Sequence, residues 1–147
     1  MNDREELSCF KSSSQLMAGV LVAISIPIFT SQLEKSRDAV TLANLRAAYA
    51  EAQTAYLTKG SAADATAGEV TTNGDHTVTV KKATAGYTVE VTKVASKGQK
   101  VGLDNSDQLP FNASGLTGAD SMGGTAKDWT VTFTYYGDGE ITGVSAA

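Results

Sequence analysis

Reactive side chains are scarce in this chain, which contains one cysteine, Cys9, and one histidine, His76. A lone cysteine excludes an intramolecular disulfide and the cysteine-based types of metal site. A reactive cysteine also needs a histidine or a basic neighbourhood, and the chain has only one histidine to offer. No nucleophile–base pair, glycine-rich phosphate loop or pair of catalytic carboxylates stands out. The sequence therefore predicts a protein that is not an enzyme and that needs no cofactor and no metal.

Positive charge and proline are also in short supply. Twelve lysine and arginine residues stand against sixteen acidic residues, which gives a net charge of −4. A surface that binds nucleic acid normally clusters basic residues, so nucleic acid is not an expected partner. Two prolines against fourteen glycines indicate long regular elements joined by glycine-dependent turns. Threonine favours strands and becomes abundant only after residue 65, so the two parts of the chain differ in predicted secondary structure.

The N-terminal part of the chain changes character at residue 16. Residues 1–15 are polar, carry charges of both signs and lack the basic start of a secretory signal, so we expect them to be flexible or only partly helical. Residues 16–29 form a fourteen-residue apolar stretch, interrupted by Gly19, Ser25 and Pro27. A membrane-spanning helix needs about twenty such residues. The stretch is shorter than that, yet it is apolar on all sides, so we expect something other than its own small domain to cover it.

From residue 29 onward the pattern is that of a helix with two opposite faces. One series recurs at alternating spacings of four and three, as a single stripe on a helix does: Phe29, Leu33, Ser36, Val40, Ala43, Ala47, Ala50, Thr54 and Leu57. A second series has the same spacing and lies nearly opposite: Leu42, Leu45, Tyr49, Ala52 and Tyr56. We expect the bulky second series to pack on a sheet. The alanine-rich face would allow another helix to approach closely.

The end of this helix is predicted at Lys59, because Gly60 follows a cation in the last turn. A continuous helix over residues 16–59 would be about 65 Å long at roughly 1.5 Å per residue. Pro27 cannot donate a backbone hydrogen bond, so we expect it to kink the helix or melt it locally. A helix of this length exceeds a domain of this size, so the sequence predicts that it projects.

The second part of the chain predicts an antiparallel sheet with one buried face. Strand signals at residues 69–72 lead into the tight-turn dipeptide Asn73-Gly74. Further alternating runs are separated by glycine-containing or polar segments, and they lie at residues 76–81, 87–94, 129–135 and 140–144. We expect Trp129, Val131 and Phe133 to face the bulky side of the helix. The predicted fold is therefore α+β, one long helix packed on a four-stranded antiparallel sheet.

A long segment without strand signals, residues 96–127, is rich in Gly, Ser, Asp and Asn. A loop of this length is usually functional or disordered. We expect it to lie on the surface, tethered by its apolar residues: Leu103, Leu109, Pro110, Phe111 and Leu116. The predicted organisation has an atypical segment at 1–15, an extended helix at 16–59 with an apolar part at 16–29 and an amphipathic part at 30–59, and a sheet-containing head domain at 60–147 that carries loop 96–127.

Two nearly consecutive runs, residues 19–29 (GVLVAISIPIF) and residues 33–37 (LEKSR), resemble the N-terminal helix of type IV pilins and pseudopilins. In that family a glycine eight residues before the proline lies in the membrane-embedded helix, and Gly19 and Pro27 have this spacing. The resemblance covers roughly residues 16–60, beyond which only the order of helix, sheet and variable loop is similar. It implies a pilin-like fold, storage of the subunit in the cytoplasmic membrane and extraction into a fibre with the helices bundled at its centre.

Residues 1–15 depart from the pattern of this family. Its members begin the mature chain with an aromatic residue, just after a glycine where a prepilin peptidase cuts, and carry a glutamate four residues later. Counting back from Pro27 places Glu6 at the first position and Phe10 at the glutamate position, and no glycine precedes residue 6. Three explanations stay open: a replaced or mis-started N-terminus, an anchor altered for solubility, or a diverged member that is not processed in the usual way.

The apolar helix and the resemblance together predict a structural subunit of a type IV pilus or a related pseudopilus. Helix bundling is expected to use Gly19, Val22, Ile26, Pro27 and Phe29. The expected partners are further copies of the chain, the cytoplasmic membrane before assembly, and the pilus or secretion assembly machinery. The expected location is the bacterial cell surface, with a membrane-anchored precursor pool. An alternative is a membrane-tethered binding domain that does not polymerise and engages a ligand through loop 96–127.

Overall fold

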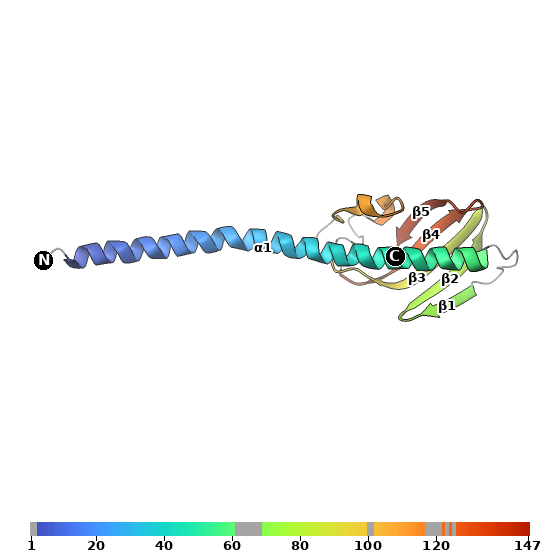
Figure 1. Ribbon diagram of the computed structural model, residues 1–147, viewed down its shortest axis with the longest axis horizontal. Coiled ribbons are helices and arrows are strands. Elements are labelled where there is room, and N and C mark those ends of the chain that lie inside the picture. Colours follow the sequence, from blue (N-terminus) through green and yellow to red (C-terminus); the bar gives the residue numbers. More distant parts are fainter. Residues whose placement is uncertain (1–2, 61–68, 100–101, 117–121, 123, 125) are drawn as a thin grey trace. The chain divides into compact units, whose positions relative to one another are not determined.

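The computed structural model describes residues 3–60, 69–99, 102–116, 122, 124 and 126–147, and within these ranges it places side chains at 26–58 and from 74 onward. The chain divides into two compact units, Met1–Glu34 and Lys35–Ala147. Figure 1 labels the helix and the strands.

One helix, α1 (Asp3–Ala55), makes up the whole described part of the first unit and provides the first element of the second. A π-helical turn at Tyr56–Gly60 follows it. Residues 3–15 are helical, whereas their sequence predicts a flexible or partly helical segment. Adding residues to an existing helix costs little compared with starting one, and this segment contains good helix formers: Glu5, Glu6 and Leu7. Pro27 lies inside α1, and the kink expected there stays a prediction.

Five antiparallel strands follow, and each pairs with its neighbours in sequence: β1 (Glu69–Asn73), β2 (His76–Ala83), β3 (Gly86–Ala95), β4 (Asp128–Tyr136) and β5 (Ile141–Ala146). The predicted α+β class is confirmed. Strands β2–β5 form the predicted four-stranded antiparallel sheet, and β1 adds a further strand at its edge. Gly74 and Asp75 form the β1–β2 turn, in which Gly74 has a φ of 62°, as the first position of a tight hairpin turn requires.

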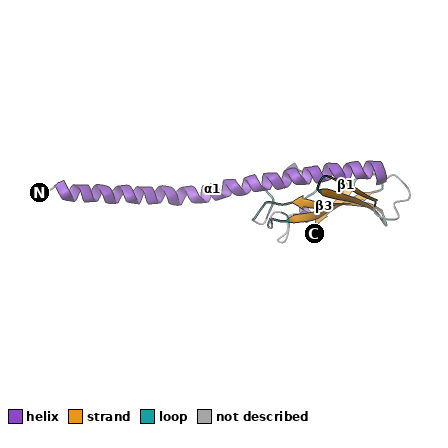
Figure 2. Ribbon diagram, turned by 90° about the horizontal axis from the view of Figure 1, so that it is seen from below, coloured by secondary structure: helices purple, strands orange, loops and turns teal. Residues whose placement is uncertain are grey.

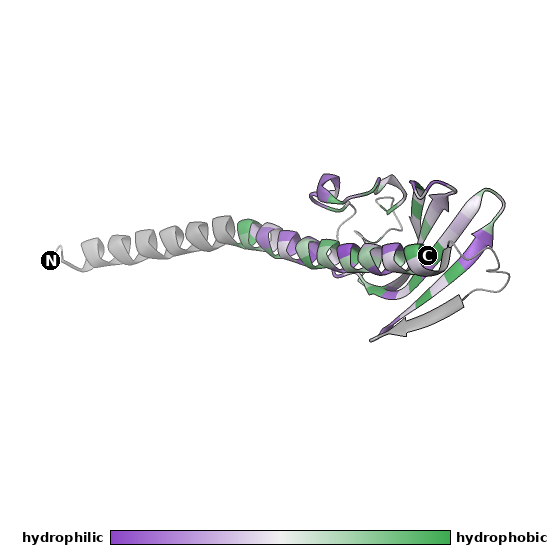
Figure 3. Ribbon diagram, turned by 45° about the vertical axis from the view of Figure 1, so that its right-hand side comes forward, coloured by the Kyte–Doolittle hydropathy of each residue, from purple (hydrophilic) through white to green (hydrophobic). Residues whose placement is uncertain are grey.

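One face of the sheet is apolar because inward-facing residues recur at every second position and meet across the strands. Val78 pairs with Val91, Val91 pairs with Val131, and Val89 pairs with Phe133. All five side chains are buried. Figure 3 shows the same alternation of hydrophobic and hydrophilic residues along the strands.

This alternation shifts by one residue near the end of β3. The register with β4 is interrupted between Val91 and Val94, and Lys93 adopts a left-handed φ of 60°. A bulge of this kind bends the strand and adds one residue between two inward positions. Val91 and Val94, three positions apart, are both fully buried as a result.

Residues 35–55 of α1 lie over the apolar face of the sheet, as Figure 2 shows. The buried apolar residues of this helical segment form one row: Leu42, Leu45, Ala48, Ala52 and Ala55. Tyr49 and Tyr56 are half-buried against the same core, to which β4 contributes Trp129, Val131 and Phe133. The residues expected to join helix and sheet therefore belong to one hydrophobic core or pack against it.

Aromatic rings connect the helix to the sheet at two places. Tyr56 stacks on Tyr135 with ring centres 4.4 Å apart. Phe111 meets Phe133 edge-on at 5.4 Å, and Tyr49 lies beside both phenylalanines at 5.5 and 6.2 Å. Ring pairs of this kind contribute about 0.5–1.5 kcal/mol each beyond the apolar area that they bury.

The connection between β3 and β4 is attached to the hydrophobic core of the second unit by its own buried apolar residues: Leu103, Leu109, Phe111, Ala113, Leu116 and Met122. Met122 was not among the residues that the sequence predicted to tether this connection. Pro110 was expected among the tethers and is exposed, because it lies between two residues whose side chains turn inward. Short 3-10 helices at Ser106–Gln108 and Ser114–Leu116 shape the connection. The remainder of the predicted loop, at 100–101, 117–121, 123 and 125, lies outside the described residues.

Candidate assembly surface

Large apolar side chains of α1 in the first unit are exposed: Ile26 (57%), Ile28 (59%), Phe29 (75%) and Leu33 (45%). Pro27, which lies among them, is exposed as well. Single exposed hydrophobic residues are common on protein surfaces, whereas a contiguous group of them makes this part of α1 a candidate assembly surface. The side chains of Gly19 and Val22, also expected to take part in helix bundling, lie outside the described residues. No helix in the described part of the chain combines the length and the apolar character that crossing a membrane requires.

The part of α1 in the second unit also leaves one side uncovered. Seven exposed residues of this part of α1 and of the π-helical turn after it form a continuous line, here termed the exposed stripe: Ser36, Val40, Ala43, Ala47, Ala50, Thr54 and Leu57. Val40 is 45% exposed and Leu57 is 70% exposed. These seven residues are the second-unit members of the first helical series found in the sequence, and the opposite series faces the sheet. Small side chains with an apolar residue towards each end suit close contact with another helix.

Polar side chains on α1 hold the chain that leaves β3. The hydroxyl of Thr41, which is fully buried, accepts a hydrogen bond from the Lys97 N–H at 3.0 Å. One turn farther on, the Asn44 side-chain amide donates to the Ala95 carbonyl at 2.8 Å. Each bond satisfies a backbone group that the end of the strand leaves without a ladder partner.

Two further contacts extend this attachment towards the beginning of the second unit. Asp38, only 5% exposed, accepts a hydrogen bond from the Asp104 N–H at 3.3 Å. The Arg37 guanidinium donates to the Gln99 side chain at 3.1 Å. Together with Thr41, these residues give α1 a polar side that fastens the β3–β4 connection, distinct from both its buried row and its exposed stripe.

The β1–β2 hairpin is attached to α1 by the chain's one histidine. Nδ1 of His76 lies 2.9 and 3.0 Å from the two carboxylate oxygens of Glu51. Both side chains are about four-fifths buried, with 21% and 18% exposed. Partial burial strengthens such a contact relative to one on an open surface. The histidine therefore serves as a structural link between the helix and the edge of the sheet.

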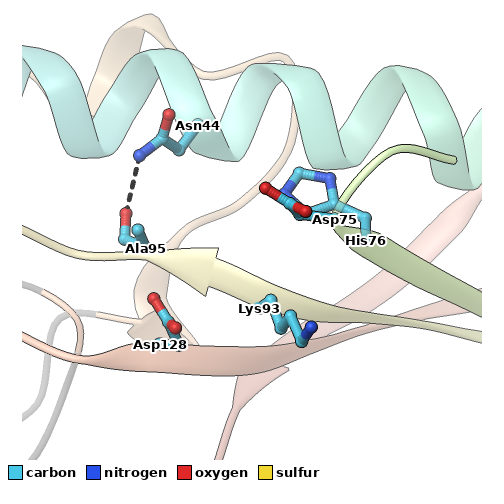
Figure 4. Close-up of a pocket in the computed structure, with 6 residues that line it drawn as sticks. All are labelled: Asn44, Asp75, His76, Lys93, Ala95 and Asp128. Atoms are coloured by element: carbon cyan, nitrogen blue, oxygen red, sulfur yellow. Dashed lines mark hydrogen bonds between the residues drawn. The ribbon is translucent and has the colours of Figure 1, made fainter.

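A cavity of about 510 Å³ lies beside this link, between α1 and the sheet. Figure 4 shows its mostly polar lining, to which α1, the β1–β2 turn, β2, β3 and β4 contribute: Asn44, Asp75, His76, Lys93, Ala95 and Asp128. Among the described residues, this lining contains no hydroxyl or thiol side chain. In the described residues no group of three His, Cys, Asp or Glu side chains is arranged to hold a metal ion.

Two polar atoms in the core of the second unit have no hydrogen-bond partner among the described residues, the Tyr135 hydroxyl and the Trp129 indole Nε1. Burial raises the pKa of the Tyr135 phenol well above its ordinary value, and the neighbouring Tyr49 and Tyr56 add to the shift. The phenol is thus held neutral inside the core. Neither residue lines the cavity beside His76.

Comparison with protein-family models, with curated proteins and with solved structures gave no match to this chain.

The sequence did not identify the residues that fasten the β3–β4 connection. Asp38 and Thr41 looked like ordinary polar positions between the two helical series, and their burial depends on where residues 97–104 return to the helix. One signal was present, because a polar residue repeats at Asp38, Thr41 and Asn44 with helical spacing. This polar series lies between the buried side of the helix and its exposed stripe. A polar series in that position favours hydrogen bonds with a loop.

Proposed function

We propose that this chain is a structural subunit of a filament of the type IV pilus or pseudopilus kind, assembled through α1. Its partners would be further copies of the chain, with the cytoplasmic membrane holding the subunit before assembly and a pilus or secretion machinery extracting it. The finished filament would stand at the bacterial cell surface. The sequence resemblance over residues 16–60 supports this proposal.

The observation that carries the proposal is the exposure of apolar side chains along α1, above all the 75% exposure of Phe29. Exposed apolar area tends to be removed from water, and each large side chain that becomes buried contributes roughly 1–2 kcal/mol. Four such side chains in the first unit would supply several kcal/mol for association. In the second unit, the exposed stripe would let α1 contact another copy without disturbing the core, since core residues occupy the opposite side.

The test introduces a charge into the apolar surface of the first unit. We expect Ile26→Asp, or a charge at Val22, to abolish fibres, because a carboxylate would be buried among apolar side chains on assembly. Lys35→Glu is the matched control: Lys35 is exposed on the same helix and already carries a charge, so its replacement adds no charge among apolar side chains and fibres should persist. Fibres would be counted by electron microscopy of cells that express each variant, and circular dichroism of the purified chains would establish that the sheet still forms.

Unchanged fibres in Ile26→Asp would count against assembly through α1. Finding the wild-type chain in the membrane as a monomer, with no fibres that contain it, would favour the tethered binding domain instead. Mass spectrometry of isolated surface fibres distinguishes the two outcomes, because it identifies the subunit directly.

A further inference from the structure

The two edges of the sheet differ in how they are covered. Along β5 the 3-10 helix Ser114–Leu116 lies so close that a Cβ atom on Gly115 would come within 2.2 Å of the Val144 carbonyl oxygen. Strand β1 at the opposite edge pairs with β2 alone in the described part of the chain. Open edges present unpaired N–H and C=O groups to other chains.

The register of the β1–β2 hairpin indicates which backbone groups point outward. In an antiparallel pair, hydrogen-bonded residue pairs alternate with pairs whose N–H and C=O groups point away from each other. Thr72 pairs with Thr77, and the Thr77 N–H donates across to the Thr92 hydroxyl of β3 at 3.1 Å, away from β1. Thr72 and Thr77 are therefore a non-hydrogen-bonded pair. The N–H and C=O of Thr72, and by alternation those of Val70, face the open side.

The sequence of β1 has little of what usually keeps an edge strand from pairing. It contains neither lysine nor proline, its ladder with β2 runs without a bulge from Glu69 to Asn73, and three β-branched residues stand at 70–72. Natural edges are commonly protected by those very features. Two protective features remain in the described strand, its shortness and the charge of Glu69 at its first position.

We infer that the open edge of β1 is a self-association surface, on which a second copy of this chain adds its own β1 in antiparallel orientation about a two-fold axis at Thr71. In this register Val70 of the first copy lies opposite Thr72 of the second, and Thr72 of the first copy lies opposite Val70 of the second. The four outward groups of each copy then form four hydrogen bonds, while Thr71 lies opposite its own equivalent in a non-hydrogen-bonded pair.

Charge selects the same register. Each Glu69 lies opposite Asn73 of the other copy, so the two carboxylates stay at opposite ends of the paired strands. Registers centred on Val70 or Thr72 join fewer outward groups of β1, because one outward residue of each copy then lies opposite a residue beyond the ends of the strand. A self-complementary patch about a two-fold axis is the commonest form of association between identical chains. This inference does not rest on the proposed filament.

The test is a register-specific cross-link in the full chain, kept in mild detergent so that the apolar part of α1 is covered, in a Cys9→Ser background. Across the axis the two Thr71 Cα atoms would be about 4.5 Å apart, within the range that a disulfide spans. Two Val70 Cα atoms would be about 8–9 Å apart, beyond that range. With oxidised glutathione, we expect Thr71→Cys to form a covalent dimer at least fivefold faster than Val70→Cys, and a mixture of Val70→Cys and Thr72→Cys to form a mixed dimer.

Charge variants give a second, independent readout. Thr71→Lys and Thr71→Glu each place like charges across the axis, so each alone should be monomeric in sedimentation, and an equimolar mixture should associate. Equal cross-linking of Thr71→Cys and Val70→Cys, or no cross-linking of either, would overturn the inference. So would association of Thr71→Lys as strong as that of the wild type. Contact through α1 would cross-link both cysteine variants alike, and cross-linking that survives in Ile26→Asp excludes that origin.

Discussion

Replacing Gly86 by alanine tests how closely β3 and β4 approach at the end of the sheet. Gly86 begins β3 opposite Tyr136, with a φ of 153° that side-chain-bearing residues rarely adopt. A Cβ atom built on it would lie 2.0 Å from the carbonyl oxygen of Tyr135 and 3.1 Å from the Cα of Tyr136. Both neighbours are backbone atoms, so no side-chain rotation relieves the clash. The two strands must separate by more than 1 Å at this point.

The cost follows from what that separation breaks. One or two ladder hydrogen bonds are lost at about 1 kcal/mol each, and the unfavourable φ adds about 1–3 kcal/mol. Alanine also has less conformational entropy than glycine in the unfolded chain, which offsets this loss of stability by about 0.4–1 kcal/mol. The net loss of stability is about 2–4 kcal/mol, which for a unit of this size lowers the Tm by roughly 8–16 °C.

Thermal unfolding of the full chain in mild detergent, followed by circular dichroism of the sheet, measures this loss. The matched control is Gly143→Ala in β5, where an added Cβ would meet nothing within 4 Å. The control should keep the Tm of the wild type or raise it slightly. A Gly86→Ala variant within 1 °C of the wild type, or a control that falls as far as Gly86→Ala, would refute the close approach of the strands.

Tyr135→Phe should raise stability by about 1 kcal/mol, because its hydroxyl is buried without a partner among the described residues, whereas Tyr136→Phe, at a side chain 54% exposed, should change nothing. The raised pKa of Tyr135 means that the folded chain keeps a proton that the unfolded chain releases above pH of about 10. Stability should therefore fall as the pH rises past that value, and less steeply in Tyr135→Phe; equal slopes in alkaline melting curves would argue against a buried phenol. His76→Ala should cost about 1 kcal/mol by removing the contact with Glu51, and urea titration should show it as a lower midpoint at an unchanged slope. Leu45→Ala, at a fully buried position, should cost about 2–5 kcal/mol in the same titration, and a loss below 1 kcal/mol would exclude it from the core.

Periodicity in the sequence was enough to separate the two sides of α1. A residue series with helical spacing keeps one direction whatever packs against it, so Leu42 and Leu45 could be assigned to one side and Ala43 and Ala47 to the other. The bulky series is buried because the sheet presents an apolar face to it. The buried face of the strands could be predicted in the same way, since alternation puts Val131 and Phe133 on one face and both are buried.

Features that depend on contacts between distant segments could not be predicted in this way. The buried Asp38 is explained by the return of the chain at Asp104, which no local pattern specifies. The bulge in β3 left one trace, the spacing of three between Val91 and Val94, where strict alternation would give two. The edge position of β1 depends on the order of strands in the sheet, and that order is a property of the whole fold.

The aromatic residues of the two units are unequally divided, and this has a practical consequence. Trp129 is the one tryptophan of the chain, and it and all five tyrosines belong to the unit Lys35–Ala147. The indole is 4% exposed, with the Lys127 ammonium 3.8 Å from its ring centre. Ultraviolet fluorescence excited in the indole band therefore reports on the sheet-containing unit alone. Its emission would distinguish a variant that has lost its fold from one that has lost only the ability to join other copies.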